Sequence, residues 1–184
     1  MAIQFKYDPV KTSQAVAFLL QRHGGLMKYL HLIKLLYLAD RHALDQWERT
    51  ITGDSYCSMP LGPVLSKTFD LIKGADSDSY WSTHFRTEQH SLILKTPSLR
   101  DKLSDAEIKI LAEVDDQYGA MDQWELVDHL HRSLPEYRDP RGSSIPISIE
   151  DILNALSVPA SDQERIAVEV QAEQSLADLL GVDC

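Results

Sequence analysis

The stretch LMKYLHLIKLLYLADRHALDQW, residues 26–47, predicts a helix of about six turns at 3.6 residues per turn. Apolar side chains line one stripe of this helix: Leu26, Leu30, Ile33, Tyr37, Leu44 and Trp47. Further leucines cover its other faces. A helix that is apolar nearly all round is buried on several sides, so we expect the rest of the chain to wrap around it. Charged residues interrupt every window long enough to cross a bilayer, so this helix is not a membrane span.

Two charged residues, Lys34 and Asp40, lie within this apolar stretch. In one interpretation they are structural: Lys34 extends along the helix and brings its ammonium group to water, while Asp40 caps or pairs with a neighbour. In the other they form a polar site, or part of a partner surface, on a core helix. Because buried charges must be paired, we favour the first interpretation and assign both residues to a structural polar core.

The composition is typical of a globular protein. A chain of 184 residues is long enough for one domain with a full core and a short appendage. The N-terminus lacks the basic-then-apolar segment of a secretory signal. The two cysteines, Cys57 and Cys184, are too few and too unevenly placed for a disulfide framework. We therefore expect a protein of the reducing cytoplasm, with no membrane partner.

Charge is unevenly spread along the chain. Residues 1–74 carry nine Lys and Arg and six Asp and Glu, a net charge of +3. Residues 75–184 carry a net charge of −13, which gives the total of −10. Nucleic-acid binding needs clustered basic residues, so an acidic chain is a poor candidate for it. The acidic half favours solubility, or alternatively a basic protein partner.

The fold class predicted from the pattern is mainly α (α+β), with a small antiparallel β-hairpin packed on a helical domain. A first helix is expected from Thr12 or Ser13 to Arg22, and another is expected to begin at Gly62-Pro63. Residues 81–96 read as the hairpin. Capping signals predict helices after Ser104 and Asp122, and another helix is expected over residues 148–156. We divide the chain into a domain, residues 1–156, and an acidic amphipathic helix or tail, residues 157–184.

Known catalytic and metal-binding patterns are not found in the sequence. His129 and His131 are two residues apart and fall on different faces of a helix, unlike the four-residue spacing of zinc-binding helices. Cys57 has no local activating pattern, so a half-buried structural thiol is the preferred interpretation. A helix-turn-helix around Gly119 would present acidic residues to DNA, the wrong sign for a groove. We expect no enzyme activity, no cofactor, no metal and no direct DNA binding.

The sequence resembles the Panacea domain, the SocA-like antitoxin domain of toxin–antitoxin systems. The resembling pieces are KLLYLAD (34–40), ITGD (51–54), Tyr56, MPLGPV (59–64), FDLIKG (69–74), WEL (124–126), His131 and PEY (135–137), together with Leu103, Ser104 and Glu107. The likeness covers about residues 12–156. Tyr137 departs from the pattern, since Trp is more usual there.

The resemblance implies the antitoxin of a bacterial, phage or plasmid toxin–antitoxin pair, a setting that includes phage defence. Such an antitoxin binds and neutralises a cognate toxin, usually encoded next to it. The founding SocA type instead acts as an adaptor that delivers its toxin to a ClpXP-type protease. Many relatives carry a DNA-binding domain before the Panacea region, and residues 1–11 leave no room for one here.

The loop from Thr52 to Val64 is the candidate toxin-binding surface. Aromatic and Met side chains on a loop stiffened by Gly and Pro are suited to an interface. The candidate residues are Thr52, Asp54, Tyr56, Met59, Pro60, Leu61 and Val64. The alternative is that these residues only pack the fold. The acidic tail is a second candidate, since it could cover a basic toxin surface.

Three functions therefore follow from the sequence, in this order. The first is an antitoxin that neutralises its toxin by direct binding. The second is a proteolytic adaptor, which would lower toxin levels only when the protease is present. The third, far behind, is a metal- or thiol-dependent enzyme, which would show bound metal or a reactive Cys57. The sequence leaves open the toxin's identity, the stoichiometry and the oligomeric state.

Overall fold

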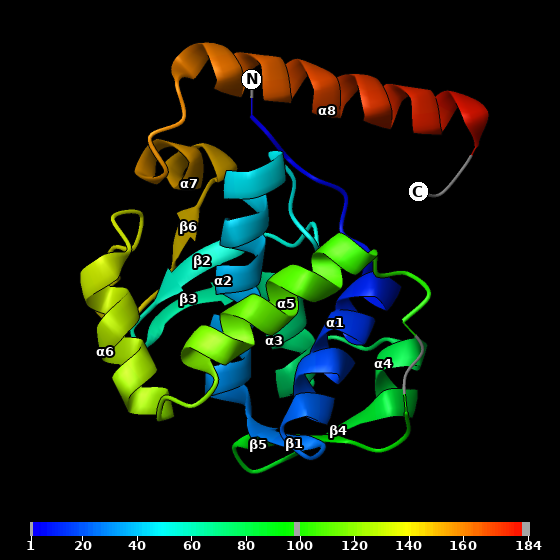
Figure 1. Cartoon of the computed structure of the whole chain (residues 1–184), viewed down its shortest axis with the longest axis vertical. Coiled ribbons are helices and arrows are strands. Elements are labelled where there is room, and N and C mark those ends of the chain that lie inside the picture. Colours follow the sequence, from blue (N-terminus) through cyan, green and yellow to red (C-terminus); the bar gives the residue numbers. More distant parts are fainter. Residues whose placement is uncertain (1, 98–99, 182–184) are drawn as a thin grey trace.

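The structure of the chain is a computed structural model that describes residues 2–97 and 100–181. Within these ranges it is mainly helical, with two small antiparallel sheets, which confirms the predicted fold class (Figure 1). The helices are α1 (Pro9–Arg22), α2 (Tyr29–Trp47), α3 (Ser66–Lys73), α4 (Ser79–His84), α5 (Asp105–Tyr118), α6 (Gln123–Ser133), α7 (Ile149–Ala155) and α8 (Ala160–Leu180). The strands are β1 (Leu26–Lys28), β2 (Tyr56–Met59), β3 (Gly62–Leu65), β4 (Phe85–Glu88), β5 (Ser91–Leu94) and β6 (Ile145–Ile147).

Helix α2 runs through the middle of the molecule, as its apolar faces predict (Figure 1). Its neighbours include α5, β3, α6, α1, α3 and α7. Its start was predicted wrongly, because residues 26–28 form strand β1, whose Met27 pairs with Leu92 of β5. As a result Leu26 lies outside the buried stripe and is 50% exposed, and Trp47 at the other end is 38% exposed.

The hairpin also begins later than predicted. Strands β4 and β5 pair over residues 85–94, whereas Trp81 belongs to the short helix α4. Asp78 caps this helix, since its carboxylate accepts a hydrogen bond from the Trp81 backbone N–H at 2.8 Å. Together with β1, the hairpin forms a sheet of order β1-β5-β4 at the end of the molecule where α2 begins (Figure 1).

The second sheet has the order β3-β2-β6. The prediction of a helix start at Gly62-Pro63 was wrong, because residues 62–65 are strand β3, paired with β2 from Tyr56↔Leu65 to Met59↔Gly62. Helix α3 therefore begins only at Ser66. We call Met59–Gly62, where β2 turns into β3, the hairpin tip.

Local capping signals placed the starts of α5 and α6 correctly, and the structure adds a third capping box at α7. Side chains at the N-cap and three residues later bond each other's backbone N–H groups at the start of α5, α6 and α7. The first helix begins earlier than predicted, at Pro9, because Asp8 is the cap and accepts a hydrogen bond from the Lys11 N–H. Thr12 and Ser13 are buried inside α1.

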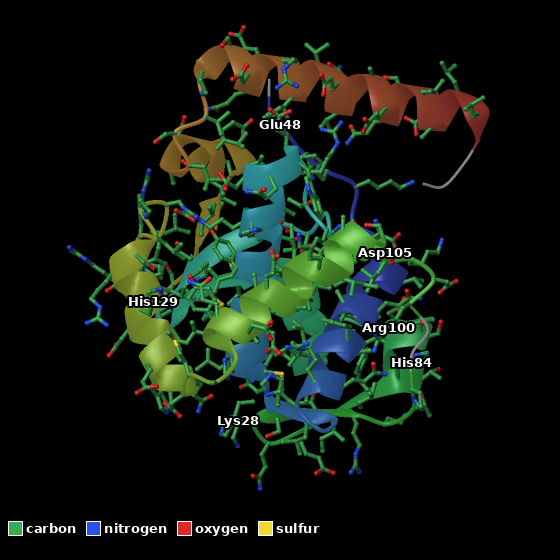
Figure 2. All side chains as sticks on the ribbon, viewed as in Figure 1. Lys28, Glu48, His84, Arg100, Asp105 and His129 are labelled. Carbon is green, nitrogen blue, oxygen red and sulfur yellow. The ribbon has the colours of Figure 1, made fainter. Side chains whose placement is uncertain are left out.

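Helix α8 lies across the end of the molecule at which α2 terminates (Figure 1). Only Ile166, Ala167 and Val170 of this helix are buried. Arg165 Nη2 pairs with Glu48 at 2.6 Å, and Figure 2 shows Glu48 beneath the helix. The second half of α8 leaves Leu176, Leu179 and Leu180 57%, 84% and 66% exposed. No helix of the described ranges is long and apolar enough to cross a membrane.

Candidate functional site

An apolar groove of about 470 Å³ opens beside the first half of α2. Five other parts of the chain contribute to it: the end of β1, the hairpin of β2 and β3, α3, the turn between β4 and β5, and the start of α6. The lining residues are Lys28, Tyr29, Leu30, Lys34, Met59, Pro60, Leu61, Val64, Phe69, His90, Gln123 and Trp124. Leu61 and Trp124 line the groove and are 43% and 54% exposed. We refer to this site throughout as the apolar groove.

The hairpin tip is held in one position by side chains from outside the sheet. Gly62 has φ +100°, a conformation that L side chains rarely adopt. The Tyr137 hydroxyl donates to the Met59 carbonyl at 3.1 Å. The Tyr137 ring in turn stacks on His131 of α6, with centroids 4.5 Å apart and planes 5° from parallel. The apolar side chains of the tip are therefore presented on a rigid support.

Lys34 lies in the wall of the groove and is fully buried. Its Nζ donates to the Pro63 carbonyl at 2.7 Å instead of extending to water. Burial lowers the pKa of Lys34 from 10.5 to about 7, an effect that the nearby Cys57 thiol opposes. The expectation that the ammonium group reaches solvent was wrong, because the sheet of β2 and β3 covers this face of α2.

Asp40 holds the chain that leaves α2. Its Oδ1 accepts the backbone N–H groups of Ile51 and Thr52 at 2.7 and 3.0 Å. Its Oδ2 accepts the hydroxyls of Thr52 and Tyr56, the latter at 2.8 Å. Burial raises the pKa of Asp40 to about 6, although these four hydrogen bonds favour the carboxylate.

Gly53 and Asp54 extend the hydrogen-bond network around Asp40, and the Asp54 N–H donates to the Thr52 hydroxyl at 3.1 Å. We call this network of Asp40, Thr52, Asp54 and Tyr56 the polar brace. Gly53 has φ +66°, and a Cβ atom there would lie 2.0 Å from the Lys6 carbonyl oxygen. Asp54 accepts the Lys67 and Thr68 backbone N–H groups at 3.0 and 2.9 Å, and the Thr68 hydroxyl at 2.7 Å. The N-cap residue of α3 provides no capping side chain. Asp54, which lies just before β2 in the chain, caps α3 instead. The ITGD motif thus ties the chain before β2 to α2 and to the start of α3.

A second buried carboxylate ties α2 to the segment after α6. Glu136 Oε1 accepts the Tyr37 hydroxyl at 3.0 Å and pairs with Arg41 Nε at 2.7 Å. Its side chain is fully buried. This contact fixes the Glu136–Tyr137 segment, and so supports the tyrosine that holds the hairpin tip.

The structure separates the seven candidate binding residues into two groups. Thr52, Asp54 and Tyr56 are buried and belong to the polar brace. Val64 is buried but lines the groove, together with Met59, Pro60 and Leu61. Sequence reasoning did not include the groove residues from other elements, among which Trp124 is the exposed large apolar side chain. The sequence signal that could have identified Trp124 as a surface residue was its position in the first turn of a capped helix.

The side chains considered for metal or thiol chemistry lie apart. His131 stacks on Tyr137, whereas His129 contacts Tyr118 at a centroid distance of 5.5 Å and lies on the outer side of α6 (Figure 2). Cys57 is half-buried, and the Ser66 hydroxyl lies 3.6 Å from its sulfur. Over residues 2–97 and 100–181, no three His, Cys, Asp or Glu side chains are grouped to hold a metal ion.

Comparison with known proteins gives one match. A family model described as the antitoxin SocA-like Panacea domain matches residues 32–135, more than half of the chain. This range includes Lys34, the hairpin tip and Trp124, and it confirms the resemblance found in the sequence. Comparisons with curated proteins and with solved structures gave no match.

Proposed function

We propose that this chain, which belongs to the antitoxin SocA-like Panacea family, neutralises a cognate toxin by binding it directly. Family membership supports an antitoxin role in general, and a regulatory role rather than an enzymatic one. The proposal adds that the toxin is encoded next to this chain and that both act in the bacterial cytoplasm, in a setting such as phage defence. It assigns toxin binding to the domain of residues 1–156 and treats residues 157–184 as an acidic appendage.

The observation that carries this proposal is the apolar groove with the exposed side chains of Leu61 and Trp124 in its lining. Soluble proteins rarely leave large apolar side chains together on the surface unless a partner covers them. Interfaces concentrate their binding energy in aromatic anchors and well-formed pockets. A tip braced by Tyr137 also loses little conformational freedom on binding, which favours affinity.

The test is co-expression with the toxin encoded next to this chain. Wild type should restore growth, while Leu61→Asp and Trp124→Ala should lose rescue and weaken toxin binding by roughly thirtyfold or more, as expected for hot-spot residues. Leu26→Asp on β1 is the matched control, because Leu26 is 50% exposed and does not line the groove. If both groove variants rescue growth as well as wild type, the groove is not the toxin-binding surface.

The adaptor alternative requires a second surface for a ClpXP-type protease. The second half of α8 offers one, since Leu176, Leu179 and Leu180 are exposed there. In that case toxin levels would fall only in cells that contain the protease, and Leu176→Asp, not Leu61→Asp, would abolish the fall. Rescue that is equal with and without the protease would remove the adaptor. The same α8 variant tests whether the acidic appendage covers a basic toxin surface.

A further inference from the structure

We infer that the apolar groove receives an acidic segment of the toxin, in which an apolar side chain fills the groove and an adjacent carboxylate pairs with Lys34. This inference rests on the proposed function and identifies the chemistry of the partner. It makes Lys34 the residue that selects acidic over neutral segments, in addition to its place in the core.

The charged lining of the groove has one sign. Of its twelve lining residues, the basic ones are Lys28, Lys34 and His90, and none is Asp or Glu. Figure 2 shows Lys28 at the outer edge of the molecule, where α2 begins. Lys73 adds a further cation beside the groove, since its Nζ lies 5.2 Å from the centre of the Tyr29 ring. This positive face contrasts with the net charge of −10 of the whole chain.

Lys34 has unused hydrogen-bonding capacity. An ammonium group has three N–H donors. Within the described residues, the Nζ makes a single hydrogen bond, to the neutral Pro63 carbonyl, and no carboxylate pairs with it. A buried charge in this state lacks the counter-charge that buried charges need. A carboxylate from a partner would supply the missing charge and the missing acceptors together.

Gly62 leaves room beside the amine. A Cβ atom at Gly62 would lie only 3.3 Å from the Lys34 Nζ and 3.6 Å from the His131 Nε2. The absence of a side chain at this point keeps the two basic groups close to the backbone of the hairpin tip. Any larger residue would crowd the amine, so the tip is built around Lys34.

The acidic character of the occupant follows from charge complementarity. Complementary potentials guide partners together and penalise like-charged ones, so an apolar groove whose charged residues are all basic favours an acidic segment. A second copy of this chain carries similar chemistry, because the end of α8 combines Leu176, Leu179 and Leu180 with Glu173 and Asp178. We assign the groove to the toxin, since α8 lies outside the matched range 32–135 that holds the groove's main walls.

The experiment selects peptides from a random dodecamer library displayed on phage against the full-length protein. We expect enrichment of Asp or Glu next to Leu, Phe, Met or Trp. Selection on Lys34→Met should keep the apolar preference and lose the acidic one. Lys109→Met is the matched control, because Lys109 is 75% exposed on α5, and it should select the same peptides as wild type. Selected peptides without acidic residues, or an unchanged preference in Lys34→Met, would overturn the inference.

If Lys34→Met does not fold, a binding measurement on the wild-type protein tests the inference instead. The best selected peptide and its Asp→Asn or Glu→Gln counterpart are compared by fluorescence polarisation. The acidic peptide should bind at least tenfold more tightly, and equal affinities would refute the role of Lys34. Sedimentation velocity measures whether the protein forms a dimer. A dimer that dissociates in Lys34→Met or Leu176→Asp would show that the groove binds a second copy of this chain.

The outcome is independent of the growth test. If Leu61→Asp abolishes rescue but the selected peptides are neutral, the toxin-binding role stands and the acidic specificity falls. If Leu61→Asp leaves rescue intact while acidic peptides are selected, the groove binds an acidic segment of another protein and the proposed function falls.

Discussion

Replacing Lys34 by Met should stabilise the isolated protein near neutral pH. Burial lowers the pKa of Lys34 from 10.5 to about 7. Between these values the unfolded chain holds a proton that the folded protein lacks, so the stability of wild type rises with pH across this window. The whole window corresponds to about 5 kcal/mol, at roughly 1.4 kcal/mol for each pH unit.

Met removes this pH dependence and also the hydrogen bond to the Pro63 carbonyl. Losing a buried hydrogen bond and leaving its acceptor unpaired costs about 2 kcal/mol. We therefore expect Lys34→Met to be about 3 kcal/mol more stable than wild type at pH 7, by combining these two effects. The advantage should shrink by about 3 kcal/mol between pH 7.5 and 9.5, and its sign should reverse near the upper end.

The assay is urea unfolding followed by tryptophan fluorescence at several pH values, with linear extrapolation to water. Taking the difference between variant and wild type cancels other groups that titrate, such as the buried tyrosines. Lys109→Met should differ from wild type by less than about 0.5 kcal/mol throughout, as is usual for exposed sites. If Lys34→Met is less stable than wild type at pH 7, with a difference that does not change with pH, the reasoning about a buried, unpaired amine is refuted.

The remaining predictions concern the brace, the appendage and the pH dependence of binding. Gly53→Ala should lower the free energy of unfolding by at least about 2 kcal/mol, because its Cβ would meet the Lys6 carbonyl, and thermal melts will show whether it does. Asp54→Ala should cost about 2 to 3 kcal/mol by uncapping α3, with partial recovery in Asp54→Asn; equal stability of all three proteins would contradict this. Removing residues 175–184 should change stability by less than about 0.5 kcal/mol in the same urea assay, since this part of α8 is exposed. Affinity for a selected acidic peptide should fall about tenfold per pH unit above pH 7, as Lys34 loses its proton, and an affinity that stays constant to pH 9 would exclude the ammonium as partner.

The helices were the most predictable part of the fold, because their signals are local. The capping boxes at Ser104 and Asp122 each lie within four residues, and both helices begin where these boxes predict. The burial of α2 likewise follows from the abundance of leucine on all its faces. Its first three residues were misassigned because Met27 is fixed by pairing with Leu92, which is distant in the sequence.

The candidate site was predictable only in part. The composition of the loop after α2 singled it out as a candidate, and its tip lines the groove. Which residues of that loop face outward depends on strand register, since neighbouring side chains of a strand point to opposite faces. Pairing of Tyr56 with Leu65 sends the Tyr56 hydroxyl to Asp40 and leaves the Pro60-Leu61 turn at the surface.

The sequence by itself therefore determined a mainly helical fold around one buried helix and membership of an antitoxin family. These properties depend on composition, helical periodicity and short motifs, which are present in the order of residues. Only the tertiary structure decided that Lys34 is buried in the wall of the groove, that ITGD belongs to the polar brace and that Trp124 and Leu61 line one groove. The reason is physical: burial and proximity arise from contacts between segments far apart in the chain, and no local pattern encodes which segments meet.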